Sequence, residues 1–134
     1  MADKYKIYTE LNLLVVKISQ EEKSFEDLYN LAKEIRQSKD FSIIHYTFID
    51  FRGAKVSFDR DKIKDFKNLI DEYKNIDNQQ SVVYVMDEPM ITVFVHLLIN
   101  KVNSTRKYCS TVHKAYDLLG LDVSLEKFEE LINI

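Results

Sequence analysis

Two segments that are apolar on both of their alternating faces constrain the fold of this chain most strongly. They are Phe41–Phe51 and Ser81–Met86. A strand with one face in water alternates between apolar and polar residues, whereas a continuously apolar strand is covered on both faces. These segments therefore predict central strands of a mostly parallel sheet between two layers of helices. With the most apolar helix, they are expected to supply the core residues Ile44, Phe48, Val83, Val85, Phe94 and Leu98.

The rest of the chain supplies the other elements that such a sheet requires. Lys4–Thr9 and Leu13–Ile18 predict a β-hairpin that turns at Asn12, because Asn tolerates the left-handed conformation. Arg106–Val112 predicts a last short strand. Capping residues and apolar residues three or four apart predict helices. One helix begins at Ser24. The others cover about Asp59–Asn75, Met90–Val102 and His113–Leu119, and a terminal helix is capped by Asp122 or Ser124.

These elements together predict one α/β domain over residues 1–134. Strands that alternate with helices are joined by right-handed crossovers, which place the strands parallel and the helices on both sides. The opening hairpin adds one antiparallel pair. We therefore expect a mixed, mostly parallel five-stranded sheet with helices on both faces.

The charge, cysteine content and apolar runs of the chain limit the partners and the cellular compartment that we expect. The chain has 19 basic and 22 acidic residues, and its basic residues between Arg60 and Lys67 alternate with aspartates, which argues against nucleic-acid binding. Cys109 is the single cysteine, so no internal disulfide forms and a reducing compartment, the cytoplasm, is expected. The longest apolar run, Met90–Ile99, is shorter than the ~18–20 residues that span a bilayer, so no transmembrane segment is expected.

The segment Asp50–Ala54 (DFRGA) resembles the SpoIIAA-like proteins of the STAS superfamily (sulphate transporter and anti-sigma-factor antagonist). The order of elements is similar over most of the chain. The resemblance implies a STAS-like fold and a non-enzymatic role. Antagonists in the superfamily bind a kinase-like anti-sigma factor and are switched by phosphorylation of a serine after the matching strand. Here Ser57 is the nearest hydroxyl and acidic Asp59 and Asp61 follow it, so we expect no such switch.

Polar side chains that follow the predicted central strands are candidates for a ligand site. Asp50 and Arg52 end one central strand, and Asp87 follows the other. Ligands of open α/β sheets collect at the carboxyl ends of strands, and an arginine there can hold a carboxylate or a phosphate. The alternative is structural, with Arg52 paired to Asp50 and with Asp87 capping the next helix. His113, after the last strand, completes the candidate set.

Cys109 and His113 are the residues on which an enzyme would have to rely. A thiolate nucleophile needs a neighbouring base and a third group to orient it, which His113 and Asp50 would supply. The alternative is a small buried cysteine without reactivity. No metal and no cofactor are expected, because His45, His96 and His113 are far apart in sequence and two isolated glycines do not form a phosphate-binding loop.

The helix at Met90–Val102 has more apolar surface than one sheet contact covers. Its apolar arc is about twice the ~100° that a helix on one sheet face needs. Either the terminal helix covers the remainder, or this surface contacts a partner protein, a second copy of the chain or an apolar ligand. The predicted contact side consists of Val95, Ile99 and Val102.

Three functions are consistent with these observations. The first is a non-catalytic protein-binding or regulatory module, with a homodimer as one form. The second is a binder of an apolar small molecule or lipid between sheet and helix, which a cavity of ~300 Å³ or more would indicate. The third is a cofactor-free hydrolase or transferase that uses Cys109 and His113.

Overall fold

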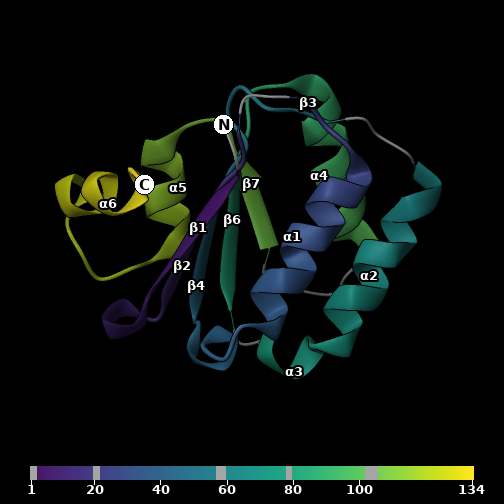
Figure 1. Ribbon diagram of the computed structural model, residues 1–134. Helices are drawn as coiled ribbons and strands as arrows, with labels where there is room; N and C mark the ends of the chain where they lie inside the picture. The colour runs from purple at the N-terminus through teal and green to yellow at the C-terminus, as the bar shows by residue number, and fades with distance from the viewer. Residues whose placement is uncertain (1–2, 20–21, 57–59, 78–79, 102–105) are drawn as a thin grey trace.

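Five strands form the central sheet in the order β1-β2-β4-β6-β7 (Figure 1). The computed structural model describes residues 3–19, 22–56, 60–77, 80–101 and 106–134. The pair β1–β2 at one edge is antiparallel, and the other neighbours are parallel. This confirms the predicted mixed, mostly parallel five-stranded sheet. The strands are β1 (Lys4–Tyr8), β2 (Leu13–Lys17), β4 (Tyr46–Asp50), β6 (Ser81–Val85) and β7 (Arg106–Cys109).

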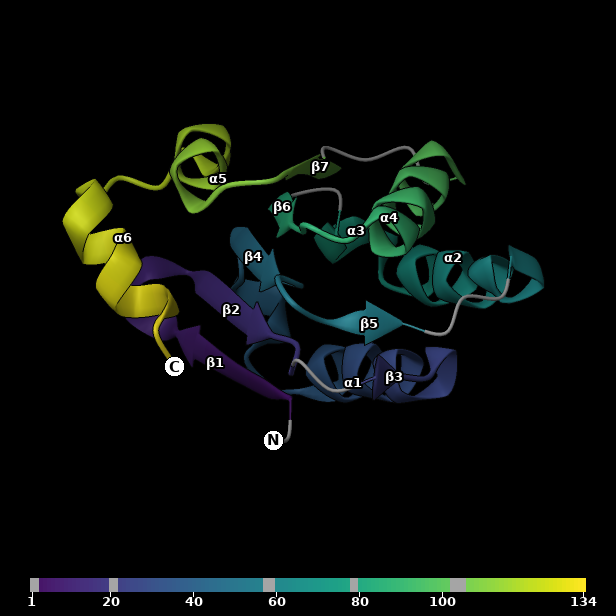
Figure 2. The same cartoon turned by 90° about the horizontal axis from the view of Figure 1, so that it is seen from above.

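Helices cover both faces of this sheet, as predicted. Seen from above, α1, α2 and α4 lie on one side of the strands and α5 and α6 on the other (Figure 2). None of the described helices is long and apolar enough to cross a lipid bilayer. The helices are α1 (Phe25–Gln37), α2 (Ile63–Glu72), the short α3 (Lys74–Asp77), α4 (Pro89–Lys101), α5 (Val112–Leu119) and α6 (Leu125–Ile132).

Local capping fixes where these elements begin and end. Ser24 Oγ accepts from the Asp27 backbone N–H at 3.1 Å, and the Asp27 side chain accepts from the Ser24 N–H at 3.2 Å, which is the predicted capping box. Ser124 caps α6. Gly120 ends α5 with φ 76°, a left-handed angle that favours glycine. Asn12 takes the same conformation, φ 53°, in the hairpin turn.

Strand alternation divides the core into two halves. In β2, Leu14 and Val16 face α1, α2 and α4, whereas Leu13 and Val15 face α5 and α6. Phe48 lies against Phe128 of α6 in an edge-to-face contact with ring centroids 5.3 Å apart. All six residues predicted for the core are at most 3% exposed, so that prediction is confirmed.

Several elements differ from the sequence predictions. The last strand, expected to reach Val112, ends at Cys109, because Val112 begins α5. The strand expected from Phe41 begins only at Tyr46, because Phe41–Ile43 forms a 3₁₀ turn that buries Phe41 in the core. The helix expected to reach Asn75 ends at Glu72, and α3 restarts at Lys74. The strands β3 (Glu22–Lys23) and β5 (Lys55–Val56) form an additional parallel pair, which is too short to leave a periodic pattern.

The predicted contact side of α4 is wrong in one residue and unsupported in another. Val95 is fully buried, and Ile99 is half-buried against the core on the α1, α2 and α4 side. Val102 lies outside the described residues. The terminal helix α6 does not cover α4, because it packs on the opposite face of the sheet (Figure 2). The sheet and α2 cover most of the wide apolar arc instead, since α4 packs against both, and Met90 and Val93 remain exposed.

Candidate functional site

The carboxyl end of β4 carries an ion pair between Asp50 and Arg52. Arg52 Nε donates to Asp50 Oδ1 at 3.0 Å and Nη2 donates to Oδ2 at 2.8 Å. The Arg52 backbone N–H also donates to Oδ1, at 2.9 Å. Hydrogen bonding to Asp50 raises the pKa of Arg52 above its ordinary value, against the opposing effect of burial. Both oxygens of the buried Asp50 carboxylate therefore accept hydrogen bonds from Arg52, as in the structural alternative given for this pair in the sequence analysis.

Asp87 has a different role from the predicted helix cap. Its Oδ1 accepts from the Gly53 backbone N–H at 3.0 Å, and Gly53 has φ 75°. Glu88 is the residue that caps α4, since its Oε2 accepts from the Ile91 N–H at 3.0 Å. One residue further along, Glu88 places its carboxylate over the first turn of the helix, where free N–H groups point. Asp87 thus ties the β6–α4 loop to the turn after β4.

Cys109 and His113 do not form a catalytic pair in this structure. The Cys109 thiol donates to the carbonyl oxygens of Thr111 at 3.4 Å and Tyr84 at 3.8 Å. Burial raises the pKa of Cys109, which disfavours the thiolate that nucleophilic attack requires. His113 is exposed at the start of α5. The structure therefore brings Asp50, Arg52 and Asp87 together at the strand ends, and among the described contacts no hydrogen bond or ion pair joins His113 to them.

The residues of this strand end are also poorly suited to metal binding. Among the described residues, no group of three or more His, Cys, Asp or Glu side chains lies close enough to hold a metal ion. The Asp50 carboxylate accepts three hydrogen bonds from Arg52. A metal would have to compete with that guanidinium for the same oxygens.

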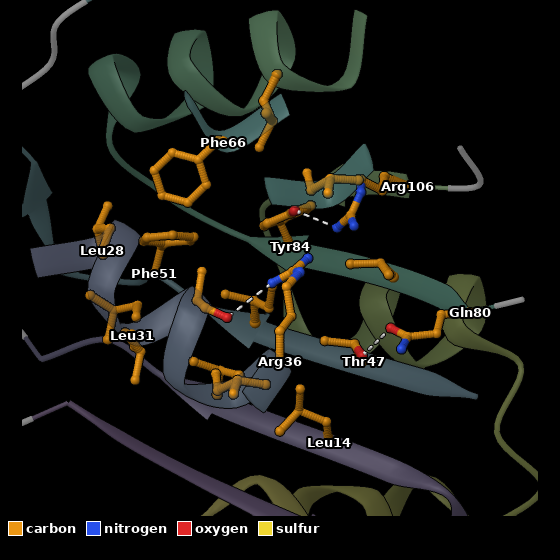
Figure 3. Close-up of a pocket in the computed structure, with 18 of the residues that line it drawn as sticks. Leu14, Leu28, Leu31, Arg36, Thr47, Phe51, Phe66, Gln80, Tyr84 and Arg106 are labelled. Carbon is orange, nitrogen blue, oxygen red and sulfur yellow. Dashed lines mark hydrogen bonds between the residues drawn. The ribbon is translucent and has the colours of Figure 1, made fainter. Parts of the chain in front are cut away.

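A cavity of about 90 Å³ lies in the other half of the fold, between the sheet and α1, α2 and α4 (Figure 3). Its walls are mainly aliphatic and aromatic. It is lined by Leu14, Val16, Ile18, Leu28, Leu31, Ala32, Ile35, Arg36, Phe41, Thr47, Ile49, Phe51, Phe66, Ile70, Gln80, Val82, Tyr84, Phe94, Leu98 and Arg106.

The cavity has a polar end. Arg106 Nη1 donates to the Tyr84 hydroxyl at 2.8 Å, and Thr47 Oγ1 donates to Gln80 Oε1 at 3.0 Å. Arg36 reaches the same region from the last turn of α1 (Figure 3). Thr47, Gln80 and Arg106 lie at or just before the beginnings of β4, β6 and β7. The polar groups are therefore at the amino ends of the parallel strands, opposite the end that sequence reasoning selected.

Solvent reaches the centre of the sheet along this cavity. Ile49 of the central strand β4 lies beside Val16 of β2 and Tyr84 of β6, yet it is only half-buried. Leu31 and Ala32 of α1 line the same space and are half-buried as well. The cavity is thus partly open, and a small molecule in solution has a route to its apolar walls.

A scan against protein-family models, a search of curated proteins and a search of solved structures found no match. The assignment of a site consequently depends on geometry and chemistry alone. By those criteria the cavity is the strongest candidate, because binding sites are typically apolar pockets with a few convergent polar groups.

Sequence reasoning missed the residues at the polar end, although part of the pattern was visible. Leu28, Ala32 and Arg36 are four residues apart, so they share one face of α1. An arginine on the apolar face of a helix indicates either a chain that reaches the surface or a polar site within the fold. Arg106 and Thr47 gave no such pattern, because each lies at or near the start of a short strand that also carries other polar residues.

Proposed function

We propose that this protein is a non-catalytic binding module that holds a small, largely apolar molecule in the cavity between the sheet and α1, α2 and α4. The observation that carries the proposal is the partly open apolar cavity with polar groups gathered at one end. An unfilled cavity costs about 24 cal/mol per Å³, so a 90 Å³ cavity forgoes about 2 kcal/mol of packing. A bound molecule would recover much of that energy.

The size of the cavity limits the ligand. A cavity of about 150 Å³ accommodates benzene, which has six non-hydrogen atoms. By that ratio, about 90 Å³ corresponds to roughly four such atoms inside the walls. This volume is well below the ~300 Å³ expected for a lipid site. The proposal is therefore a short-chain ligand and not a lipid.

Three observations support a non-catalytic role. The strand-end carboxylate of Asp50 is held by Arg52, Asp87 accepts from a backbone amide, and burial disfavours the Cys109 thiolate. The resemblance of the Asp50–Ala54 segment to SpoIIAA-like STAS domains is consistent with a regulatory binding module. The single cysteine is consistent with the cytoplasm.

Methyl NMR tests the proposal with a control that the fold itself provides. The cavity is lined by Leu14, Val16 and Val82, whereas Leu13 and Val83 point to the opposite face of the same strands. Titration with 1-butanol is expected to shift the methyl resonances of the first group. The resonances of Leu13 and Val83 are expected to shift by only a small fraction of that amount.

Two outcomes of this titration contradict the proposal. If neither group shifts at tens of millimolar 1-butanol, the cavity does not admit a small molecule. If both groups shift equally, the alcohol acts on the whole protein and not at a site. Selective saturating shifts of the cavity methyls support the proposal.

A second candidate, self-association, is favoured by apolar side chains exposed on α4 and β7. Met90 and Val93 of α4 are 49% and 46% exposed, and Tyr108 of the edge strand β7 is 38% exposed. The revised contact surface therefore consists of Met90, Val93 and Tyr108, and its proposed occupant is a second copy of the chain. An edge strand can pair with the same strand of another copy.

Light scattering after size-exclusion chromatography tests this candidate. If a dimer forms, Val93→Glu should dissociate it and leave the circular dichroism spectrum unchanged, since Val93 is exposed. Ile99→Glu serves as a comparison that should also lower stability, because Ile99 packs against the core. A wild-type mass of one chain across the concentration series excludes the candidate.

A further inference from the structure

The cavity contains a hydroxyl proton that no described residue accepts. Thr47 and Tyr84 carry the two hydroxyl groups of the described lining. The Thr47 hydroxyl donates to Gln80 Oε1 at 3.0 Å. The Tyr84 hydroxyl instead accepts from Arg106 Nη1 at 2.8 Å, and none of the hydrogen bonds between described residues uses its proton. A buried donor without an acceptor is unfavourable, so this proton indicates where the oxygen of a ligand would bind.

Packing fixes the position of the Tyr84 hydroxyl. Tyr84 is 5% exposed, and its ring stacks on that of Phe51, with centroids 6.3 Å apart and planes inclined by 21°. Both rings line the cavity. Figure 3 shows the Tyr84 hydroxyl directed toward Arg106 at the polar end. The donor is therefore already ordered, and a ligand that accepts its proton does not have to immobilise a further side chain.

The hydrogen bond from Arg106 determines which kind of ligand Tyr84 can hold. A phenol hydroxyl can both donate and accept. Because Arg106 already donates to the Tyr84 oxygen, the hydroxyl is left with its donor function toward a ligand. Consecutive hydrogen bonds also polarise one another, which strengthens the Tyr84 O–H as a donor. Both effects act through this one bond and do not require the charge of Arg106 to be unbalanced.

We propose that the cavity binds a short neutral ketone or alcohol whose oxygen accepts the hydrogen bond of the Tyr84 hydroxyl. This inference rests on the proposed function and specifies its ligand class. About four atoms fit within the walls, so the ligand has the size of 2-butanone or 1-butanol. A hydrocarbon of that size leaves the Tyr84 proton without an acceptor. A carboxylate would exchange the hydration of two charged oxygens for one phenol donor, which is unfavourable.

Methyl NMR titrations of the wild type and of Tyr84→Phe test this assignment. The oxygen-bearing probes are 2-butanone and 1-butanol, and 1-chlorobutane is an apolar probe with the same number of non-hydrogen atoms. Comparing each probe between the two proteins cancels the different hydration of the free probes. Tyr84→Phe is expected to weaken 2-butanone and 1-butanol about threefold to tenfold and to leave 1-chlorobutane within about twofold. The probe that loses more identifies the preferred acceptor, a carbonyl or a hydroxyl oxygen, and either result supports the assignment.

A matched variant and a second measurement support this comparison. Tyr29 packs in the same half of the core but does not line the cavity, so Tyr29→Phe should leave all three affinities unchanged. If Tyr84→Phe does not fold, infrared spectroscopy of 2-butanone bound to the wild type replaces it. The carbonyl stretch of the bound ketone should lie at a lower frequency than in hexane, because an accepted hydrogen bond weakens the C=O bond. A band at the hexane frequency would overturn the assignment.

The outcomes separate this inference from the proposed function. If Tyr84→Phe changes the affinities of all three probes equally, or changes none of them, the hydrogen bond to Tyr84 is not made and the cavity remains a site for apolar molecules. If none of the probes shifts a cavity methyl resonance of the wild type, the proposed function itself is wrong. Butyrate is the anionic probe, and tighter binding of butyrate than of 2-butanone would overturn the assignment of a neutral ligand.

Discussion

Filling the cavity with a side chain should stabilise the protein. Ala32 lines the cavity from α1, and Ala32→Leu adds three carbons, which occupy about 75 Å³ at the ~25 Å³ per atom of a benzene-filled cavity. At about 24 cal/mol per Å³ the gain is at most ~1.8 kcal/mol. Ordering a leucine side chain costs about 0.5–1 kcal/mol. The expected net increase in the free energy of unfolding is therefore about 1 kcal/mol.

Urea denaturation followed by circular dichroism measures this change, and Ala115→Leu is the matched control. Ala115 is fully buried on the opposite face of the sheet and does not line the cavity. The same substitution there overpacks a filled core, which costs about 1–3 kcal/mol. Ala32→Leu should also abolish the shifts that 1-butanol causes in the cavity methyl resonances, since the added side chain occupies the site. If Ala32→Leu destabilises the protein as much as Ala115→Leu does, the space is not available and the reasoning fails.

Three further predictions concern the framework around the site. Phe48→Ala removes a fully buried ring that contacts Phe128 and should cost about 3–5 kcal/mol in urea denaturation; a loss below ~1 kcal/mol would contradict the assigned register. Asp50→Asn should cost about 1–2 kcal/mol, because it breaks the ion pair but leaves Arg52, which is 43% exposed, accessible to water; no change would show that the pair is not structural. Cys109 should react with iodoacetamide more slowly at pH 7.5 in the folded than in the urea-unfolded protein, because burial raises its pKa. The folded state binds the thiol proton up to a higher pH than the unfolded state does. The stabilisation that results is therefore present below the ordinary thiol pKa and is lost as the pH rises through the pKa of the folded state. Equal alkylation rates of the folded and unfolded protein would contradict the burial of the thiol.

The layered fold was predictable because its pattern is local. A strand such as Ser81–Val85, apolar on both faces, has to be covered on both sides wherever it lies in the chain. The boundaries at Ser24, Gly120 and Ser124 followed from capping chemistry, which involves neighbours within one turn. Both kinds of information are contained in short windows of sequence.

The turn at Phe41–Ile43 was not predictable in this way. Its residues have the composition of a strand, but Phe41 is buried in the core. Its ring contacts that of Tyr73 edge-to-face, with centroids 5.9 Å apart. That contact joins residues more than thirty positions apart. Tertiary packing therefore overrides the local preference for a strand.

The environment of α4 shows a second limit of prediction from sequence. A helical wheel correctly indicated that more than one neighbour must cover the apolar arc, but it does not identify the neighbour. The structure places α2 beside α4 and puts α6 on the other face. Val95 is consequently core and not surface. The same limit applies to the polar end of the cavity, which is assembled from residues as distant as Arg36 and Arg106.

A crystal structure of the protein grown with 1-butanol tests the central claim most directly. The account predicts 1-butanol in the cavity, with its hydroxyl group among the polar side chains of Thr47, Gln80 and Tyr84 and its alkyl chain among Leu14, Val82 and Leu98. A cavity without 1-butanol, or 1-butanol bound only at the strand end beside Arg52, would contradict the account.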